Sequence, residues 1–155
     1  RIGLHGKMFG MYKFRTMYNN AHKQRDQLKL SSQEDSPLFK LDEDPRIITG
    51  LGFLRKYSID ELPQLFNVVK GEMSLVGPRP LFAEDTEYFD KNYMRRLNVL
   101  PGMTGLLQIN YRNTDDFKIW YKYDLEYIEN WNLKLDVEIL FKTLRTVFNR
   151  RNSGK

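Results

Sequence analysis

The sequence of 155 residues contains no cysteine, only two histidines and no long hydrophobic run. Without cysteine, neither a disulfide framework nor a thiolate metal site is possible. The histidines, His5 and His22, are too few for a histidine-rich metal centre. Any divalent ion would be held by carboxylates and substrate oxygens, which favours magnesium or manganese over zinc.

No apolar stretch approaches the roughly 20 residues of a membrane-spanning helix, and no signal peptide is recognisable. The chain opens on Arg1 and lacks an initiator methionine, which is typical of a fragment. The absence of a membrane segment in these residues therefore says little about the parent protein.

The composition is that of a packed domain with a basic surface. Hydrophobic residues make up 41% and aromatic residues 14% of the chain, a composition that favours a packed core over wholesale disorder. The length suits one domain over 1–155. The net charge of +5 indicates an anionic partner, which would be a nucleic acid, an anionic lipid or a phosphorylated small molecule.

The patterns predict a compact α+β fold, predominantly helical, with a few short strands and long ordered loops. The expected elements are a strand or hairpin over 7–17, a helix over 20–30, one or two helices over 53–70, a helix over 82–99, a strand over 104–112 and a helical tail over 117–150. An apolar stripe within the tail is more typical of core packing, although its basic flank also fits a membrane interface.

The adjacent carboxylates Asp60 and Glu61 are the first candidate site. Ser58 and Glu61 match the S-x-x-E capping box, so the local sequence by itself favours a capped helix start. The functional interpretation is that one carboxylate is a nucleophile or metal ligand and the other orients it. A helix start beneath the pair would help to keep Asp60 ionised.

Arg79 is the second candidate, because it stands between Pro78 and Pro80. It is either a solvated loop arginine or a rigidly held guanidinium that forms a fork for phosphate. Arg55 and Arg112 by themselves would be interpreted as surface residues, although Arg112 follows a segment with few charges, where binding loops often occur.

An ordered series of motifs is more specific than any single one. It comprises Tyr12–Met17, Asp44–Ile47, Leu54–Val68, Gly71–Pro80, Pro101–Gly105, Gln108–Arg112 and Asp124–Trp131. The series resembles the bacterial sugar transferase family, the monotopic polyprenyl-phosphate phosphoglycosyl transferases, over nearly the whole chain.

The resemblance implies a membrane-associated enzyme that transfers a sugar-1-phosphate from a nucleoside diphosphate sugar, usually a UDP-sugar, to a polyprenyl phosphate such as undecaprenyl phosphate. This reaction would begin the assembly of exopolysaccharide, capsule, O-antigen or a related glycan. The implied location is the cytoplasmic face of the bacterial inner membrane. A homo-oligomer is compatible with the sequence, but nothing in the sequence specifies one.

The resemblance also assigns residues. Asp60 would be the nucleophile of a covalent phosphosugar intermediate, with Glu61 beside it. Magnesium would be the cofactor, held by Asp60 and Glu61. The substrate phosphates would be bound by Lys13, Arg55, Arg79 and Arg112.

This chain departs from the family in two respects. The usual N-terminal re-entrant membrane helix is absent, so we expect the anchor in a segment outside this chain. Leu106, Leu107 and Tyr111 replace the Trp-Ala and Gly of many relatives, which weakens the assignment of sugar or lipid contacts at those positions.

Two other classes of function compete with the transferase. A nucleic-acid-binding module would use the basic and aromatic residues from Lys13 to Met17, but no RNA-binding signature accompanies them, and we expect no nucleic-acid partner. A non-catalytic scaffold at the membrane is the other, and the intact Asp60, Glu61 and Arg79 count against it.

Overall fold

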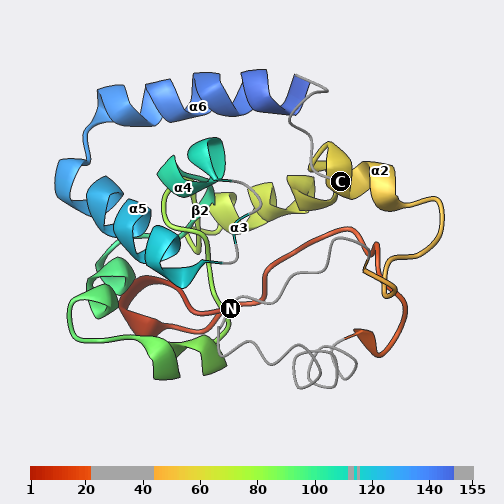
Figure 1. The fold of residues 1–155 in the computed structure, drawn as a ribbon, viewed down its shortest axis with the longest axis horizontal. Coiled ribbons are helices and arrows are strands. Elements are labelled where there is room, and N and C mark those ends of the chain that lie inside the picture. Colours follow the sequence, from red (N-terminus) through yellow and green to blue (C-terminus); the bar gives the residue numbers. More distant parts are fainter. Residues whose placement is uncertain (22–43, 112–113, 115, 149–155) are drawn as a thin grey trace.

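A computed structural model describes residues 1–21, 44–111, 114 and 116–148. Short helices surround one small sheet, which confirms the predicted α+β class (Figure 1). The elements, with η for 3-10 helices, are η1 (Leu4–Gly6), α2 (Gly52–Lys56), η2 (Ile59–Gln64), α3 (Leu65–Val69), β1 (Ser74–Val76), η3 (Glu84–Tyr88), η4 (Tyr93–Asn98), β2 (Gly102–Thr104), α4 (Leu106–Asn110), α5 (Phe117–Asn130) and α6 (Leu133–Phe148).

The sheet consists of β1 and β2 in parallel, with Ser74 opposite Gly102 and Val76 opposite Thr104. The two backbones approach very closely just after β1. A Cβ on Gly77 would lie 2.5 Å from the carbonyl oxygen of Leu100, and a Cβ on Gly102 would collide with the backbone nitrogen of Gly77. Only glycine at these positions allows this approach, and it directs the chain after β1 into an irregular loop.

Helix α5 lies between two hydrophobic clusters and holds them together. The first cluster contains Leu81, Tyr93 and Leu125, and the second contains Val76, Tyr127 and Ile139. Ile128 of α5 packs against both. Leu106 and Ile109 of α4 and Leu135 and Leu140 of α6 complete the second cluster.

The helical tail predicted over 117–150 is confirmed as far as residue 148, the last one described, by α5 and α6, which meet at a sharp turn. Asp136 stabilises this turn, because its carboxylate accepts hydrogen bonds from the Tyr127 hydroxyl at 2.9 Å and from the Trp131 indole at 3.2 Å. Helix α6 then runs along one edge of the molecule (Figure 1). No described helix has both the length and the apolar character needed to cross a membrane.

The interpretation of the α6 stripe as core packing holds for only part of it. Ile139 is fully buried and Leu140 packs beside it. Phe141 and Leu144, in contrast, are 71% and 56% exposed, and Val137 is exposed as well. The helix rests on its neighbours along one narrow face, so its second apolar face remains at the surface.

The strand or hairpin predicted over 7–17 is wrong. With the other residues that the structure describes, this segment forms only single bridges, Ile2 with Met8 and Met17 with Ile47. Its backbone is bonded elsewhere, since the Phe14 N–H donates to the Asp60 carbonyl. The helix predicted over 20–30 lies almost entirely outside the described residues.

The strand predicted over 104–112 is also wrong, because β2 ends at Thr104 and α4 follows. Leu106 and Ile109 stand three residues apart and both pack into the second cluster, which is the spacing of a helix and not of a strand.

The helix predicted over 82–99 is interrupted, and η3 and η4 take its place. Asp90 accepts a hydrogen bond from the Tyr93 N–H at 2.7 Å and so begins a new helix. The helices predicted over 53–70 are confirmed, but as three short elements, which end at Gly71 with a positive φ of 73°.

Candidate active site

Asp60 and Glu61 lie in η2, whose first turn they occupy. The predicted capping box is wrong. Ser58 has a left-handed backbone, with φ at 56°, and its side chain forms no capping hydrogen bond. The Glu61 N–H instead donates to the Ser58 carbonyl. The Glu61 carboxylate is therefore available for contacts outside the helix.

Glu61 binds two cations with a single oxygen. Lys13 Nζ donates to its Oε1 at 2.7 Å, and Arg79 Nη2 donates to the same atom at 2.9 Å. The Glu61 side chain is only 18% exposed. Burial alone would raise its pKa, but the charges of Arg79 and Lys13 outweigh burial and hold the pKa well below its ordinary range. Glu61 is therefore ionised and holds the Lys13 and Arg79 side chains at one place.

Lys13 reaches Glu61 because the extended segment around it is bonded to η2 and α3. The Phe14 N–H donates to the Asp60 carbonyl at 2.9 Å. The Tyr12 N–H donates to Oδ1 of Asn67 at 3.0 Å. Asn67 is fully buried, so this contact is a fixed attachment point. Burial, followed by the charge of Arg79, lowers the pKa of Lys13.

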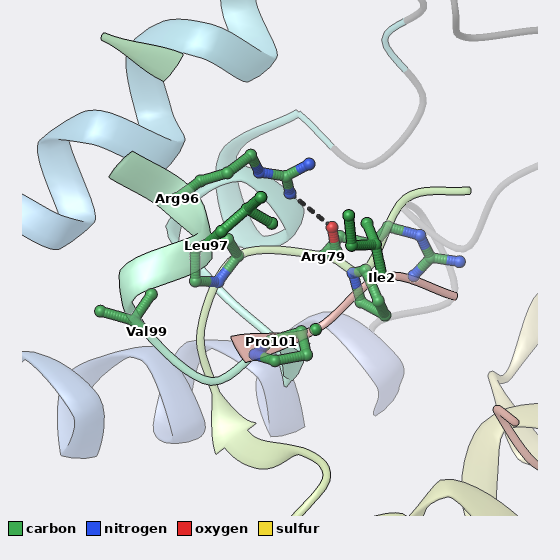
Figure 2. A pocket seen from close by; sticks show the side chains of 9 residues that line it. Ile2, Arg79, Arg96, Leu97, Val99 and Pro101 are labelled. Atoms are coloured by element: carbon green, nitrogen blue, oxygen red, sulfur yellow. Dashed lines mark hydrogen bonds between the residues drawn. The ribbon is translucent and has the colours of Figure 1, made fainter. Parts of the chain in front are cut away.

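Arg79 is held by the loop that follows β1. The Pro78 carbonyl accepts from the Gly102 N–H at 2.9 Å. The Arg79 carbonyl accepts from Arg96 Nη2 at 2.6 Å (Figure 2). The Arg79 side chain remains 34% exposed, so its guanidinium can reach a ligand while it is bonded to Glu61. Of the two alternatives for Arg79, these contacts favour the held guanidinium, and its binding of phosphate stays a prediction.

Asp60 differs from its neighbour. It is 7% exposed and forms no ion pair with any described residue. Burial raises its pKa, and the charge of Glu61 adds to this effect, while Lys13 and Arg55 act in the opposite direction. We expected a helix start to help to keep Asp60 ionised, and burial acts against that effect. A carboxylate that is desolvated and free of a salt bridge is suited to act as a nucleophile.

The remaining predicted arginines have different outcomes. Arg55 is exposed on α2, and its charge acts on Asp60, so it lies within electrostatic reach of the site. Arg112 lies outside the described residues. The structure therefore brings together Lys13, Asp60, Glu61 and Arg79, with Arg55 nearby.

A buried cation behind Arg79, Arg96, was missed by sequence reasoning, which gave this residue no role in the site. Arg96 is buried and forms an ion pair with Asp124 of α5 at 3.0 Å. The sequence contained a signal for this pair. Asp124 falls on the apolar stripe of α5, together with Tyr121, Leu125 and Ile128, and an acid on such a stripe needs a buried partner.

Comparison with known proteins identifies the family of this chain. The family model described as bacterial sugar transferase matches residues 1–150. The undecaprenyl-phosphate galactose phosphotransferase of Salmonella typhimurium is 45% identical over 97% of this chain and 32% of its own length. The exopolysaccharide production protein ExoY of Sinorhizobium fredii is 40% identical over 99% of this chain and 70% of its own.

A third relative has a more explicit name. The UDP-N-acetylgalactosamine-undecaprenyl-phosphate N-acetylgalactosaminephosphotransferase of Aeromonas hydrophila is 40% identical over 95% of this chain and 34% of its own length. The chain thus spans about a third of the length of several relatives it matches. The family match over nearly every residue confirms the resemblance carried by the motifs, and the chain belongs to the bacterial sugar transferase family.

Proposed function

We propose that this chain is the catalytic part of a phosphoglycosyl transferase. It transfers a sugar-1-phosphate from a nucleoside diphosphate sugar, with a UDP-sugar as the favoured donor, to a polyprenyl phosphate such as undecaprenyl phosphate. The reaction starts the assembly of an exopolysaccharide, capsule, O-antigen or related glycan. Family membership and the names of the Salmonella and Aeromonas relatives support this reaction.

The observation that carries the proposal is the contrast between the two carboxylates. Glu61 is bonded to Lys13 and Arg79, whereas Asp60 is buried beside it with no ion pair among the described residues. Asp60 therefore has the surroundings of a nucleophile, and its neighbour has those of a group that fixes cations near it.

In the first half-reaction, an ionised Asp60 oxygen attacks the phosphorus that carries the sugar. A bond forms between that oxygen and phosphorus, and the phosphorus–oxygen bond to the nucleoside monophosphate breaks. UMP leaves with the electron pair, and the sugar phosphate remains on Asp60. In the second half-reaction, a phosphate oxygen of the polyprenyl phosphate attacks the same phosphorus and releases the Asp60 carboxylate. Two steps at one carboxylate imply ping-pong kinetics.

The cations lower the barrier electrostatically. Attack by a carboxylate on a diphosphate brings negative charges together, and fixed cations offset this repulsion. Arg79 presents a partly exposed guanidinium and Lys13 an ammonium at the same carboxylate. Arg55 adds a positive charge from α2. Arg112 is a further candidate phosphate contact, on the basis of its motif alone.

The carboxylates fit a magnesium ion that is held mainly by substrate. Among the described residues, no group of three or more acidic or histidine side chains is placed so that it could hold a metal ion by itself. Magnesium needs no such group, since it commonly uses one or two carboxylates together with substrate phosphates and water. Asp60 and Glu61 are the residues that would hold it. When bound, the ion would neutralise charge on the diphosphate.

The surface favours a place on an anionic membrane. Phe141 and Leu144 of α6 are exposed beside the cations Lys142 and Arg145. Apolar residues that alternate with basic ones are typical of helices lying in the interface of an anionic leaflet. We propose the cytoplasmic face of the inner membrane, with the anchor in a segment outside this chain.

The test is release of UMP by the full-length protein. The assay contains a panel of UDP-sugars, undecaprenyl phosphate and magnesium. We expect release with at least one donor and, without acceptor, a mass increase of one sugar phosphate on Asp60. Asp60→Asn should abolish both results, and Glu87→Gln, an exposed acid of η3, should retain them. Absence of release with every donor, or an adduct on Asp60→Asn, would refute the proposal.

A further inference from the structure

A buried polar cluster lies directly behind Arg79 and contains Tyr93 and Arg96 of η4 and Asp124 of α5. The Tyr93 hydroxyl donates to Asp124 Oδ2 at 2.7 Å. Arg96 Nη2 lies 3.0 Å from the same oxygen and donates to the Arg79 carbonyl at 2.6 Å. Figure 2 shows the Arg96 guanidinium directed at that carbonyl. These three side chains therefore connect η4 and α5, which both contribute to the first hydrophobic cluster, to the loop after β1 that contains Arg79. We call this loop, Gly77–Pro80, the arginine loop.

Holding charges at this place is costly to the fold. The side chains of Arg96 and Asp124 are only 3% and 1% exposed. Arg96 Nε is also buried, without a hydrogen-bond partner among the described residues. An apolar filling of the same space would commonly be as stable as a buried ion pair, or more so. Stability alone is thus a poor explanation for a cation at position 96.

The contact with the Arg79 carbonyl provides a better explanation. Arg79 precedes Pro80, so its backbone is already restricted to extended conformations. The hydrogen bond from Arg96 fixes the orientation of the peptide group between these two residues. With that group fixed, the Arg79 side chain leaves the loop on the opposite side and meets Glu61 Oε1 at 2.9 Å.

We propose that Arg96 is a positioning residue that sets the direction of the Arg79 guanidinium through the Arg79 main chain. Asp124 orients Arg96 by the ion pair, and Tyr93 orients Asp124 by its hydroxyl. None of the three touches the reacting groups. The role in catalysis rests on the proposed function, because it acts on the arginine that faces the diphosphate.

The first test is a double-mutant cycle on UMP release by the full-length protein. In Arg96→Lys the charge remains, but the side chain is shorter by one bond and loses the planar fork. We expect kcat/KM for the donor to fall about tenfold in the parent, and by less than about twofold when Arg79 is already alanine. Equal losses in both backgrounds would mean that Arg96 acts independently of Arg79, and would overturn the proposal.

The neighbouring Arg95→Lys is the matched control. Arg95 lies on the same 3-10 helix but is 42% exposed and pairs with Glu129 at the surface. It should leave kcat/KM unchanged in either background. If Arg96→Lys does not fold, Tyr93→Phe takes its place, since it keeps the aromatic packing and removes only the hydroxyl. Tyr93→Phe should lower kcat/KM by less than Arg96→Lys does, and this loss should again disappear when Arg79 is already alanine.

The second test needs no turnover. In the parent, the Arg79 guanidinium donates to Glu61 Oε1 at 2.9 Å, and its Nη2 protons should therefore exchange slowly with water in nitrogen NMR of the full-length protein. If Arg79 turns away in Arg96→Lys, or in its substitute Tyr93→Phe, these protons should exchange about tenfold faster than in the parent. Unchanged exchange in the folded variant overturns the positioning role. If the parent releases no UMP, the proposed function fails while this exchange still decides whether Arg96 directs Arg79.

Discussion

At the scale of single residues, Asp60 and Glu61 are neighbours in η2 with opposite electrostatic surroundings. The pKa of Glu61 is lowered because two cations outweigh its burial. The pKa of Asp60 is raised, first by burial and then by the charge of Glu61. Because the pKa values of these adjacent carboxyls shift in opposite directions, the two groups are suited to different tasks. Glu61 stays charged, whereas Asp60 is suited to form a covalent bond.

The first prediction concerns Glu61→Gln and acid stability. Because the pKa of Glu61 is lower in the folded state than its ordinary value of 4.5, its stabilising effect is complete above that pH and is lost as the pH falls below it. The variant should be less stable near neutral pH by about 2 kcal/mol. It should also lose less stability on acidification than the parent.

Urea denaturation at several pH values measures this effect. Glu129→Gln is the matched control, because Glu129 pairs with Arg95 but is 51% exposed. Its removal should change stability by less than about 1 kcal/mol. Parallel pH profiles for the parent and Glu61→Gln would show that the contacts with Lys13 and Arg79 contribute nothing to folding.

The second prediction concerns Arg55→Gln and the pH dependence of transfer. As the proposed nucleophile, Asp60 must be ionised to attack, so activity should fall on acidification through the pKa of Asp60. The charge of Arg55 lowers that pKa, and its removal should therefore raise it. The acid limb of kcat/KM should move to higher pH, as seen in a pH–rate profile. Lys56→Gln, at the exposed neighbour, should leave the limb in place.

At the scale of elements, the parallel contact of β1 with β2 determines where the arginine loop begins. Gly77 and Gly102 allow two backbones to meet where no side chain fits. The Pro78 carbonyl, bonded to the Gly102 N–H, then anchors the loop to β2. The site thus depends on two strands of three residues each.

The third prediction tests that contact. Gly102→Ala should destabilise the protein by about 3 kcal/mol or more, since the added methyl group meets rigid backbone and not a movable side chain. Gly10→Ala is the control, because nothing lies within 4 Å of the position of its Cβ. Thermal unfolding of both variants provides the comparison. A small loss for Gly102→Ala would mean that the strands can separate at little cost.

Sequence reasoning worked where local patterns decide the structure. The helices of the tail follow from periodicity, and the restricted loop around Arg79 follows from its two flanking prolines. It failed where distant contacts decide. The Glu61 side chain turns to Lys13 and Arg79 instead of to its own helix start, and those partners are 48 and 18 residues away.

The same distinction applies to the candidate site. Four predicted site residues lie together in the structure, namely Lys13, Asp60, Glu61 and Arg79. They could be predicted largely because the ordered motifs identified the family. The function of Arg96 could not be derived from periodicity, since its position in η4 places it equally well at the surface. The apolar stripe of α5 indicates that Asp124 needs a buried partner, but the packing of α5 against η4 is what identifies that partner as Arg96.

At the scale of the whole molecule, apolar side chains remain exposed on α6 and on α3. Phe141 is 71% exposed, and Phe66 and Val69 are 67% and 87% exposed. The net charge is +5. Exposed apolar residues on a basic molecule support the proposal that this surface binds an anionic lipid layer.

The fourth prediction tests this surface with vesicles of anionic phospholipid. The double change Phe141→Ser with Leu144→Ser should weaken binding at least tenfold, because two large side chains lose their burial in lipid, at about 1.5–3 kcal/mol each. Met8→Ser is the control, since Met8 is also 60% exposed but lies near η1. Sedimentation of protein with vesicles measures the binding. Equal binding by both variants would exclude α6 from the membrane contact.

The pairing of β1 with β2 also bears on the order in which the chain folds. The strands are parallel, so Val76 and Thr104 can meet only after η3, η4 and the loop between them have closed into a ring. Closing such a ring has an entropic cost that is recovered only once the distant contact forms. Arg79 lies inside this ring. We therefore expect the four charged groups to assemble late, in the same kinetic phase as the global fold, so that a partly folded chain has no phosphate site.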